Sequence, residues 1–305
     1  MTPDALPPAP DLARFSGFAD LYDASRPTPP ARLGRWLARY AAVERPAVVD
    51  LGSGTGLSTR WAATWAASVI GVEPNADMRA VAAARPVDAV TYTDGTSAAT
   101  GLPDASADVV LAVQAMHWME PTSTLAEVAR ILRPGGVLAV VDADWPPITG
   151  SAEAELAWVA LHRRVRVLEA RLARGERGAA LCAPVAPDDP ELIHDDLADP
   201  HLHRTMPGGT RSWAKREHLA RMRRSGHFAF TRELVADEEV PGDAASFVAL
   251  LRSQGSFQHL VKAGLSEAEI GVPELVAAVD AAYAGVAGPV TTGFAYRVRI
   301  GVTAR

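Results

Sequence analysis

The stretch Val48–Gly56, VVDLGSGTG, constrains the fold of this chain more than any other. Apolar, β-prone residues lead through an aspartate into three closely spaced glycines, and an Ala- and Trp-rich segment of helical character follows. This order predicts a strand, a tight turn and a helix. Such a turn brings bare backbone N–H groups to a ligand near the helix start, in conformations that a Cβ atom disfavours. The stretch therefore predicts a nucleotide-binding cradle formed by Asp50, Gly52, Ser53, Gly54 and Gly56.

An acidic residue, Glu73, ends the next apolar run, SVIGVEPN. In a unit of this kind, an acid at the end of the second strand accepts hydrogen bonds from both hydroxyls of a ribose. The pair of features predicts an adenosine-type ligand. The dinucleotide fingerprint G-x-G-x-x-G requires glycine at position 57, where this chain has Leu57. A pyrophosphate is therefore not the favoured ligand.

Two further strings follow the cradle in the chain. Asp108–Val113 predicts a strand, and Gln114-Ala115-Met116-His117-Trp118 stands at its carboxyl end, where open α/β sheets bind their ligands. His117 is a candidate general base or, alternatively, a packing and hydrogen-bonding residue beside Trp118. The string LRPGG, residues 132–136, predicts the end of a helix and a sharp turn into a fifth strand.

Taken together, these strings resemble the class I S-adenosylmethionine-dependent methyltransferases, in particular the methyltransferase type 11 or trans-aconitate methyltransferase-like group. The resemblance implies S-adenosylmethionine as cofactor and S-adenosylhomocysteine as product, with Glu73 as the motif II acid. It also implies that Pro74 lies beside the cofactor and that Met78 packs on the adenine. Asn75 is a good N-cap for the helix that carries Met78.

The segment FSGFADLYDASRPTPP, with Phe15 and Phe18 on one helical face, resembles the N-terminal lid of the same group. This resemblance implies that Tyr22 and Arg26 face the methionine end of the cofactor. The alternative is that Tyr22 packs in the core and Arg26 is solvated.

One position departs from the group, which commonly carries Gly-Asp-Ala after the third strand, with the aspartate accepting from the adenine amino group. Thr96 stands there in this chain. Either Asp94 substitutes, or Thr96 and Ser97 hold the adenine through hydroxyl and backbone contacts. The predicted cofactor-binding set is then Tyr22, Arg26, Asp50, Gly52, Ser53, Gly54, Gly56, Glu73, Pro74, Met78, Thr96, Ser97, Gln114 and His117.

The predicted fold is α/β, a Rossmann-like seven-stranded sheet with helices on both faces and a helical cap inserted between strands 5 and 6. Four prolines in the first ten residues predict a flexible tail over 1–14. Residues 15–149 and 227–305 form the methyltransferase domain, with lid helices in 15–40. Residues 150–226 form the cap, with helices over 152–173 and 212–224.

The chemistry follows from the cofactor, because its sulfonium activates the methyl group. A carboxylate acceptor needs only positioning, whereas a hydroxyl or carbon acceptor needs a base. The candidate catalytic residues are His117 and Tyr22, and the candidate substrate residues are Trp118, Trp145, Arg163, Arg166 and Trp213. The arginines in 163–166 also fit a solvated helix face. Cys182 is the only cysteine, and the histidines, including His201 and His203, have no spacing that specifies a metal site.

Composition narrows the function class further. A net charge of −6 argues against a general nucleic-acid binder, and no apolar run is long enough to span a membrane. The N-terminus lacks a signal peptide, so we expect a cytoplasmic protein, either monomer or homodimer. The leading hypothesis is O-methylation of a carboxylate or hydroxyl of a small metabolite or natural product. The alternatives are methylation of a peptide or protein carboxylate, and a non-catalytic S-adenosylmethionine-binding module.

Overall fold

The computed structural model describes residues 19–185, 203–205, 211–284, 286 and 290–305. Seven of its strands form one sheet in the order β3-β2-β1-β4-β5-β9-β8, in which β1 to β5 run parallel and β9 runs antiparallel to both of its neighbours. The predicted seven-stranded α/β fold is confirmed. These strands are β1 (Ala47–Leu51), β2 (Ser68–Val72), β3 (Val90–Thr93), β4 (Ala107–Val113), β5 (Leu132–Ala143), β8 (Phe230–Pro241) and β9 (Thr291–Val302).

The sheet reverses its direction of growth at β1. The chain passes from β1 outward to β2 and β3, and then returns to place β4 on the other side of β1. Ligands of open α/β sheets bind at such a switch point, outside the carboxyl ends of the strands. The glycine turn after β1 and the Gln114 string after β4 therefore meet at the same edge of the sheet.

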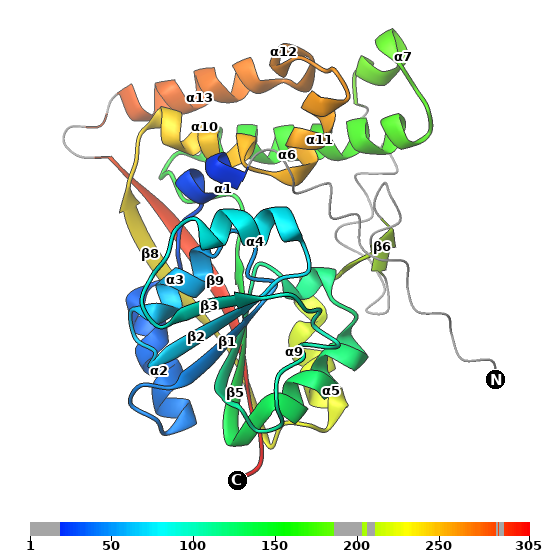
Figure 1. Cartoon of the computed structure of the whole chain (residues 1–305). Helices are drawn as coiled ribbons and strands as arrows, with labels where there is room; N and C mark the ends of the chain where they lie inside the picture. Colours follow the sequence, from blue (N-terminus) through cyan, green and yellow to red (C-terminus); the bar gives the residue numbers. More distant parts are fainter. Residues whose placement is uncertain (1–18, 186–202, 206–210, 285, 287–289) are drawn as a thin grey trace.

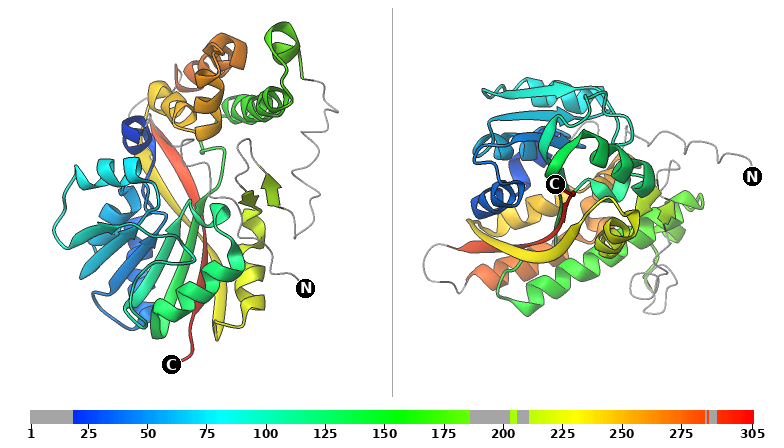
Figure 2. Two further views of the ribbon diagram at one scale, coloured as in Figure 1. Left: turned by 45° about the vertical axis from the view of Figure 1, so that its right-hand side comes forward. Right: turned by 90° about the horizontal axis from the view of Figure 1, so that it is seen from below.

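Helices cover both faces of the sheet because the parallel strands are apolar on both sides (Figure 1, Figure 2). Leu33, Leu37 and Trp61 pack with Val48 and Val109 on one face. On the opposite face, Leu125, Val128 and Met222 pack with the alternate strand residues Val49 and Val110. The covering helices are α2 (Ala31–Ala41) and α3 (Leu57–Ala63) on the first face, and α5 (Pro121–Ile131) and α9 (His218–Ser225) on the second.

A separate layer of helices lies beyond the carboxyl ends of the strands, at the top of Figure 1. Its members are α6 (Ala152–Ala173), α7 (Gly178–Cys182), α10 (Ala244–Arg252), α11 (Gly255–Lys262), α12 (Glu267–Ile270) and α13 (Val272–Ala284). Our sequence-based cap covers residues 150–226. In the structure, helices from 244–284 pack with α6 in this layer, whereas α9 lies against α5 and the sheet. The short helix α1 (Ala19–Ser25) packs against α10 and α4 (Ala76–Ala83).

The helix predicted over residues 212–224 is wrong in its first half. Strand β7 (Arg211–Trp213) pairs with β6 (His203–Thr205), and the 3-10 turn η3 (Lys215–Glu217) follows before α9 begins. Tertiary contacts explain why residues 211–213 form a strand, because β7 also packs on the 3-10 turn η2 (Met116–Trp118). The sequence also predicts a third strand over 87–91 and helices over 243–254, 266–270 and 273–283. The structure begins β3 at Val90 and adds the helix α11, which the sequence pattern does not predict. The predicted tail, Phe15, Phe18 and His201 lie outside the described residues.

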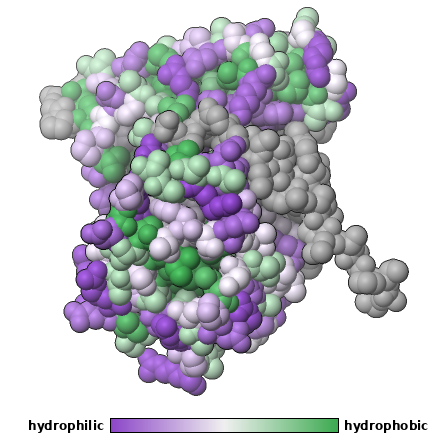
Figure 3. Space-filling model, viewed as in Figure 1, coloured by the Kyte–Doolittle hydropathy of each residue, from purple (hydrophilic) through white to green (hydrophobic). Residues whose placement is uncertain are grey.

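The face shown in Figure 3 intersperses hydrophilic and hydrophobic residues over both the helical layer and the sheet. Large exposed hydrophobic residues among those described include Leu156, Val235 and Ile148, which lie on different elements. Within the described part of the chain, no helix combines the length and apolar character needed to cross a lipid bilayer.

Candidate functional site

The glycine turn has one open position and two packed ones. Gly52, Gly54 and Gly56 have φ of 67°, 53° and 81°, in the left-handed region that glycine adopts without strain. A Cβ atom at Gly56 would lie 2.2 Å from Tyr92 Oη, and one at Gly52 would lie 2.9 Å from Ala115 Cβ. A Cβ atom at Gly54 would meet no protein atom within 4 Å. Gly54 is thus the position where a ligand can approach the bare backbone.

Glu73 is hydrogen-bonded to this turn. Its Oε2 accepts from the Gly54 N–H at 2.9 Å, and its Oε1 accepts from the Asn75 N–H at 2.9 Å. Burial raises the pKa of Glu73, and these two backbone hydrogen bonds act in the opposite direction. Because a carboxylate oxygen accepts two hydrogen bonds, each oxygen keeps one acceptor direction, enough for a pair of ribose hydroxyls. The residues fit the predicted adenosine-type ligand.

Asp50 supports the turn from behind. Its buried Oδ2 accepts hydrogen bonds from the hydroxyls of Ser58 and Thr59, both at 2.7 Å, at the start of α3. Burial raises the pKa of Asp50 to about 6, against the effect of these two hydroxyls. Backbone N–H groups of Gly52 and Ser53 donate to Val72 O at 2.8 and 3.2 Å, which ties the turn to the end of β2.

The helix after Glu73 begins as predicted. Asn75 Oδ1 caps α4 by accepting from the backbone N–H groups of Asp77 and Met78 at 2.9 and 3.3 Å. Met78 is buried in the first turn of α4, three residues after Asn75. Pro74 is half-buried between Glu73 and Asn75. Pro74 and Met78 thus flank the Asn75 cap in the segment that follows Glu73.

The residues predicted to hold the adenine have contacts within the protein. Arg79 pairs with Asp94 at 2.9 Å and also donates to the Glu73 carbonyl at 2.5 Å. Thr96 is exposed in a small turn closed by backbone hydrogen bonds to Ala99. The Ser97 hydroxyl bonds that of Thr124 on α5 at 2.8 Å. Asp94 and Ser97 therefore each have a protein partner.

Arg26 is packed between aromatic rings, so the alternative of a solvated arginine does not hold. Its guanidinium carbon lies 5.1 Å from the centre of the Tyr22 ring and 5.0 Å from that of the Trp145 ring. Its Nε donates to Ser253 Oγ at 2.9 Å. Burial lowers the pKa of Arg26, and Tyr22 acts in the opposite direction. The Arg26 guanidinium thus contacts both the lid residue Tyr22 and the predicted substrate residue Trp145.

Asp23, on α1, is a residue that was not predicted from the sequence. Its carboxylate accepts from Thr55 Oγ1 at 3.0 Å and pairs with Arg60 at 2.5 Å and Arg85 at 2.8 Å. Arg60 also donates to the Thr55 carbonyl at 2.8 Å. Asp23 therefore ties α1 to the glycine turn. Its position directly after Tyr22, in the segment that resembles the N-terminal lid, could have indicated a functional role.

The underside of α6 adds aromatic rings and cations. Trp158 stacks on Trp145 with ring centres 5.8 Å apart, and the His162 ring lies 5.2 Å from Trp158. Burial, with smaller contributions from Arg26 and Arg166, lowers the pKa of His162 to about 4. By contrast, the predicted substrate residue Arg163 is exposed. Arg166 is partly buried and acts on His162 electrostatically, whereas Arg163 faces solvent.

A second group of side chains gathers at the ends of β4 and β5. His117 Nδ1 lies 3.8 Å from Asp142 Oδ1, and the His117 ring lies 4.7 Å from that of Trp118. Strand β7 brings Trp213 to the same region by packing on η2, and Arg221 lies over the Trp213 ring at 5.3 Å. Burial lowers the pKa of His117 well below its usual value, and the charges of Lys215 and His218 make smaller contributions in the same direction. Burial thus favours the neutral form of the His117 ring.

Asp142 is the centre of this group and was also missed. Lys215 Nζ lies 3.1 Å from Asp142 Oδ1, and Arg299 donates to Asp142 Oδ2 at 2.8 Å. His218 Nε2 lies 3.8 Å from the same Oδ2. Asp142 is the last residue but one of β5, near the carboxyl end of a parallel strand, and this position is a signal that could have identified it from the sequence. Its partners come from distant segments and carry no motif.

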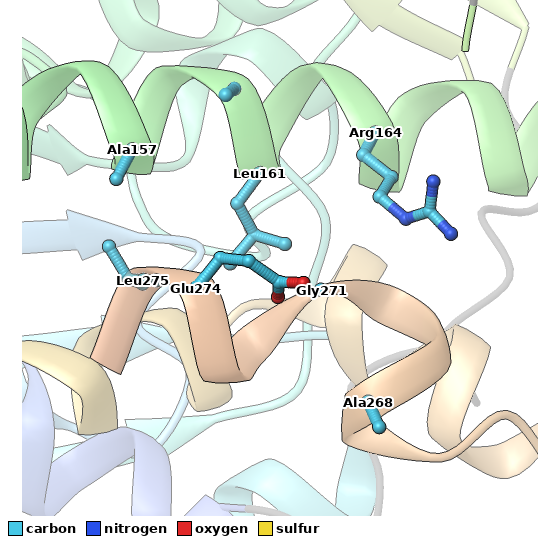
Figure 4. Close-up of a pocket in the computed structure, with 8 residues that line it drawn as sticks. Ala157, Leu161, Arg164, Ala268, Gly271, Glu274 and Leu275 are labelled. Carbon is cyan, nitrogen blue, oxygen red and sulfur yellow. The ribbon is translucent and has the colours of Figure 1, made fainter. Parts of the chain in front are cut away.

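Two hollows lie away from these residues. One, of about 340 Å³, lies between α6 and α12–α13 and is lined by residues that include Leu161, Arg164 and Glu274 (Figure 4). The other, of about 500 Å³, lies between α2 and β8 and includes Trp36 and Tyr40. Neither contains a residue predicted for the site. In the described ranges, no cluster of His, Cys, Asp or Glu could hold a metal ion.

The buried histidines make stability depend on pH. In the folded protein the pKa of His162 is lowered from 6.5 to about 4, so on acidification the unfolded chain binds a proton at His162 before the folded protein does. The free energy of unfolding therefore falls as the pH falls below about 6.5. Between pH 7.5 and 5, His162 should remove about 2 kcal/mol from the free energy of unfolding. His162→Phe should lose less stability than the wild type over this range in urea unfolding. Equal losses would show that His162 is protonated without cost in the folded state.

Comparisons with known proteins agree with this geometry. Residues 49–140 match the family described as "Methyltransferase domain". An uncharacterized methyltransferase of Mycobacterium tuberculosis is 36% identical over 145 residues, 48% of this chain and 55% of the relative. A trans-aconitate 2-methyltransferase of Azoarcus is 39% identical over 111 residues, 34% of this chain and 42% of the relative. The chain thus spans about half the length of the curated relatives that it matches.

Solved structures agree in fold. A putative type II methyltransferase from Anaeromyxobacter dehalogenans matches with a TM-score of 0.56 at 24% identity, covering 92% of this chain and 98% of the other. A putative methyltransferase from an antibiotic biosynthesis pathway of Anabaena variabilis matches with a TM-score of 0.50 at 15% identity, covering 88% and 97%. The family match coincides with the strands that carry the glycine turn, Glu73 and the Gln114 string. Residues 49–140 of the chain therefore resemble a methyltransferase domain, and the chain shares the Rossmann-like fold of these solved methyltransferase structures.

Proposed function

We propose that this protein transfers a methyl group from S-adenosylmethionine to a small-molecule acceptor. The observation that carries the proposal is the Gly54–Glu73 pair, in which an open backbone position is hydrogen-bonded to an acid with spare acceptor capacity. Glu73 would hold the ribose hydroxyls, and the turn would lie against the rest of the nucleoside. When bound, the cofactor supplies an activated methyl group.

The proposed acceptor is a carboxylate or hydroxyl oxygen. Arg26 supports an anionic acceptor because it adds a cation to a wall of aromatic rings, those of Tyr22 and Trp145. The stacking of Trp145 on the buried Trp158 supports a compact acceptor over an extended peptide. In this arrangement the side chains orient the acceptor and exclude water, which is the main work required for methyl transfer. A peptide carboxylate is the second candidate.

His117 discriminates between the acceptor types. If the acceptor is a carboxylate, His117→Ala should keep activity within about ten-fold of the wild type, because no proton has to be removed. If it is a hydroxyl, activity should fall by about 10²–10⁴-fold with cofactor affinity unchanged. The measurement is methyl transfer from radiolabelled S-adenosylmethionine to panels of carboxylic acids and phenols. Loss of cofactor affinity in the variant would instead make His117 a cofactor-binding residue.

The same assay tests the proposed function as a whole. Binding of S-adenosylmethionine with transfer to a member of either panel supports it. Failure to bind S-adenosylmethionine would refute it, and binding without transfer to small molecules or peptides would leave the non-catalytic alternative. The cytoplasmic location, the role in natural-product biosynthesis and the monomeric or dimeric state remain predictions from the sequence.

A further inference from the structure

Lys215 reaches the candidate site because its segment packs against residues about 100 positions earlier in the sequence. It begins η3, directly after the β7 strand that packs on η2. Only one other lysine, Lys262, occurs among the 30 basic residues of the chain. The packing of β7 on η2 brings the Lys215 ammonium group to the carboxyl ends of β4 and β5.

Two side chains hold this ammonium group. Lys215 Nζ donates to Gln114 Oε1 at 2.7 Å and lies 3.1 Å from Asp142 Oδ1. Gln114 has a φ of 54°, which is uncommon for a residue other than glycine and costs free energy. Such strain persists where the surrounding structure requires the conformation, commonly at functional sites. Here it accompanies the placement of an acceptor for Lys215.

The ammonium group keeps the capacity to bind a ligand. It carries three N–H donors; within the described part of the chain one donates a hydrogen bond to Gln114, and the contact with Asp142 is an ion pair. The Lys215 side chain is 34% exposed, whereas that of Asp142 is 3% exposed. Asp142 is shared with Arg299, which also pairs with Glu233. Lys215 is therefore anchored on its buried side and accessible on the other.

Buried polar atoms without a partner gather around it. Among the described residues, Gln114 Nε2, His117 Nδ1 and both ring nitrogens of His218 are buried and have no hydrogen-bond partner. Buried polar atoms in structural clusters are almost always paired, and functional sites are the common exception. These unpaired buried atoms distinguish the surroundings of Lys215 from those of an ordinary ion pair such as Arg252–Glu267. In that pair both side chains are partly exposed, and two guanidinium nitrogens of Arg252 donate to the Glu267 carboxylate.

We propose that Lys215 binds the anionic oxygen group of the methyl acceptor, with Gln114 and Asp142 as its positioning residues. This inference rests on the proposed function. Transfer to a carboxylate forms an O–C bond as the S–C bond breaks, and the electron pair of the S–C bond goes to sulfur. The carboxylate loses its charge on methylation, so the ester product binds Lys215 more weakly than the acid does. The cation therefore selects the ionised acceptor and favours release of its product.

The test compares Lys215→Met with Lys262→Met, the same substitution at the other lysine. The probes are acetate, succinate, benzoate and phenylacetate with their primary amides, titrated by calorimetry into protein saturated with S-adenosylhomocysteine. We expect the wild type and Lys262→Met to bind at least one acid ten-fold or more tightly than its amide. Lys215→Met should lose this preference while its affinity for the amide and for S-adenosylhomocysteine stays within about two-fold.

The outcomes separate the inference from the proposed function. If Lys215→Met keeps the preference for the acid, or weakens acid and amide equally, the assignment of Lys215 is overturned. It is also overturned if the wild type binds S-adenosylhomocysteine but prefers no acid to its amide. If the wild type does not bind S-adenosylhomocysteine, the proposed function itself fails.

Discussion

Glu73→Ala should weaken the binding of S-adenosylhomocysteine by about ten- to a hundred-fold. A hydrogen bond to a charged group contributes about 1.5–3 kcal/mol, and 1.4 kcal/mol corresponds to a factor of ten. The variant removes the acceptors for the ribose hydroxyls, and it also removes the carboxylate that bonds the Gly54 and Asn75 N–H groups. The measurement is a calorimetric titration of the wild type and the variant.

Glu269→Ala is the matched control for this variant. Its carboxylate also accepts from a backbone N–H group, that of Ser266 at 2.8 Å, but it lies on α12 in the helical layer. We expect the control to lose some stability and to keep the affinity of the wild type. An unchanged dissociation constant in Glu73→Ala would refute the assignment of the ribose site.

Gly54→Ala should have an effect of similar or larger size, at least about ten-fold on the same dissociation constant. The added Cβ atom meets no protein atom within 4 Å, so it projects into the space where the ligand would lie. A methyl group between the backbone and the nucleoside prevents the close approach that a glycine turn provides. The strain of a φ of 53° adds about 1–2 kcal/mol of destabilisation.

Gly101→Ala separates that strain from the ligand effect. Gly101 has a φ of 73°, and a Cβ atom there also meets nothing within 4 Å. Both variants should lose comparable stability in urea unfolding, but only Gly54→Ala should lose ligand affinity. Equal affinities in the two variants would mean that no ligand approaches the backbone at Gly54.

The elements that the sequence predicted well are those with local causes. Helix α6 has the predicted bounds because Ser151 caps its first turn and its Ala-, Leu- and Arg-rich sequence favours a helix throughout. Helix α12 begins with a capping box of Ser266 and Glu269, whose spacing of three residues is a local helix-start signal in the sequence. The parallel strands followed from short apolar runs, and the glycine turn from its spacing. Each of these signals lies within a few residues of the structure that it specifies.

The parts that the prediction missed depend on distant partners. Residues 211–213 form a strand because β6 and η2 lie beside them, and their own sequence gives no such signal. The Asp142 group joins side chains from β5, η3, α9 and β9, and no spacing in one sequence reveals such an assembly. Asp23 lay inside a string that the sequence reasoning used, but its partners Arg60 and Arg85 are set by the fold.

In the proposed function, the Gly54–Glu73 turn holds the nucleoside of S-adenosylmethionine. A crystal structure of the chain with S-adenosylhomocysteine tests it most directly. We predict that both ribose hydroxyls lie within hydrogen-bond distance of Glu73, with the nucleoside against Gly54 and the sulfur facing the ends of β4 and β5. A nucleoside bound elsewhere, or a ribose that does not contact Glu73, would show that this turn is not the cofactor site.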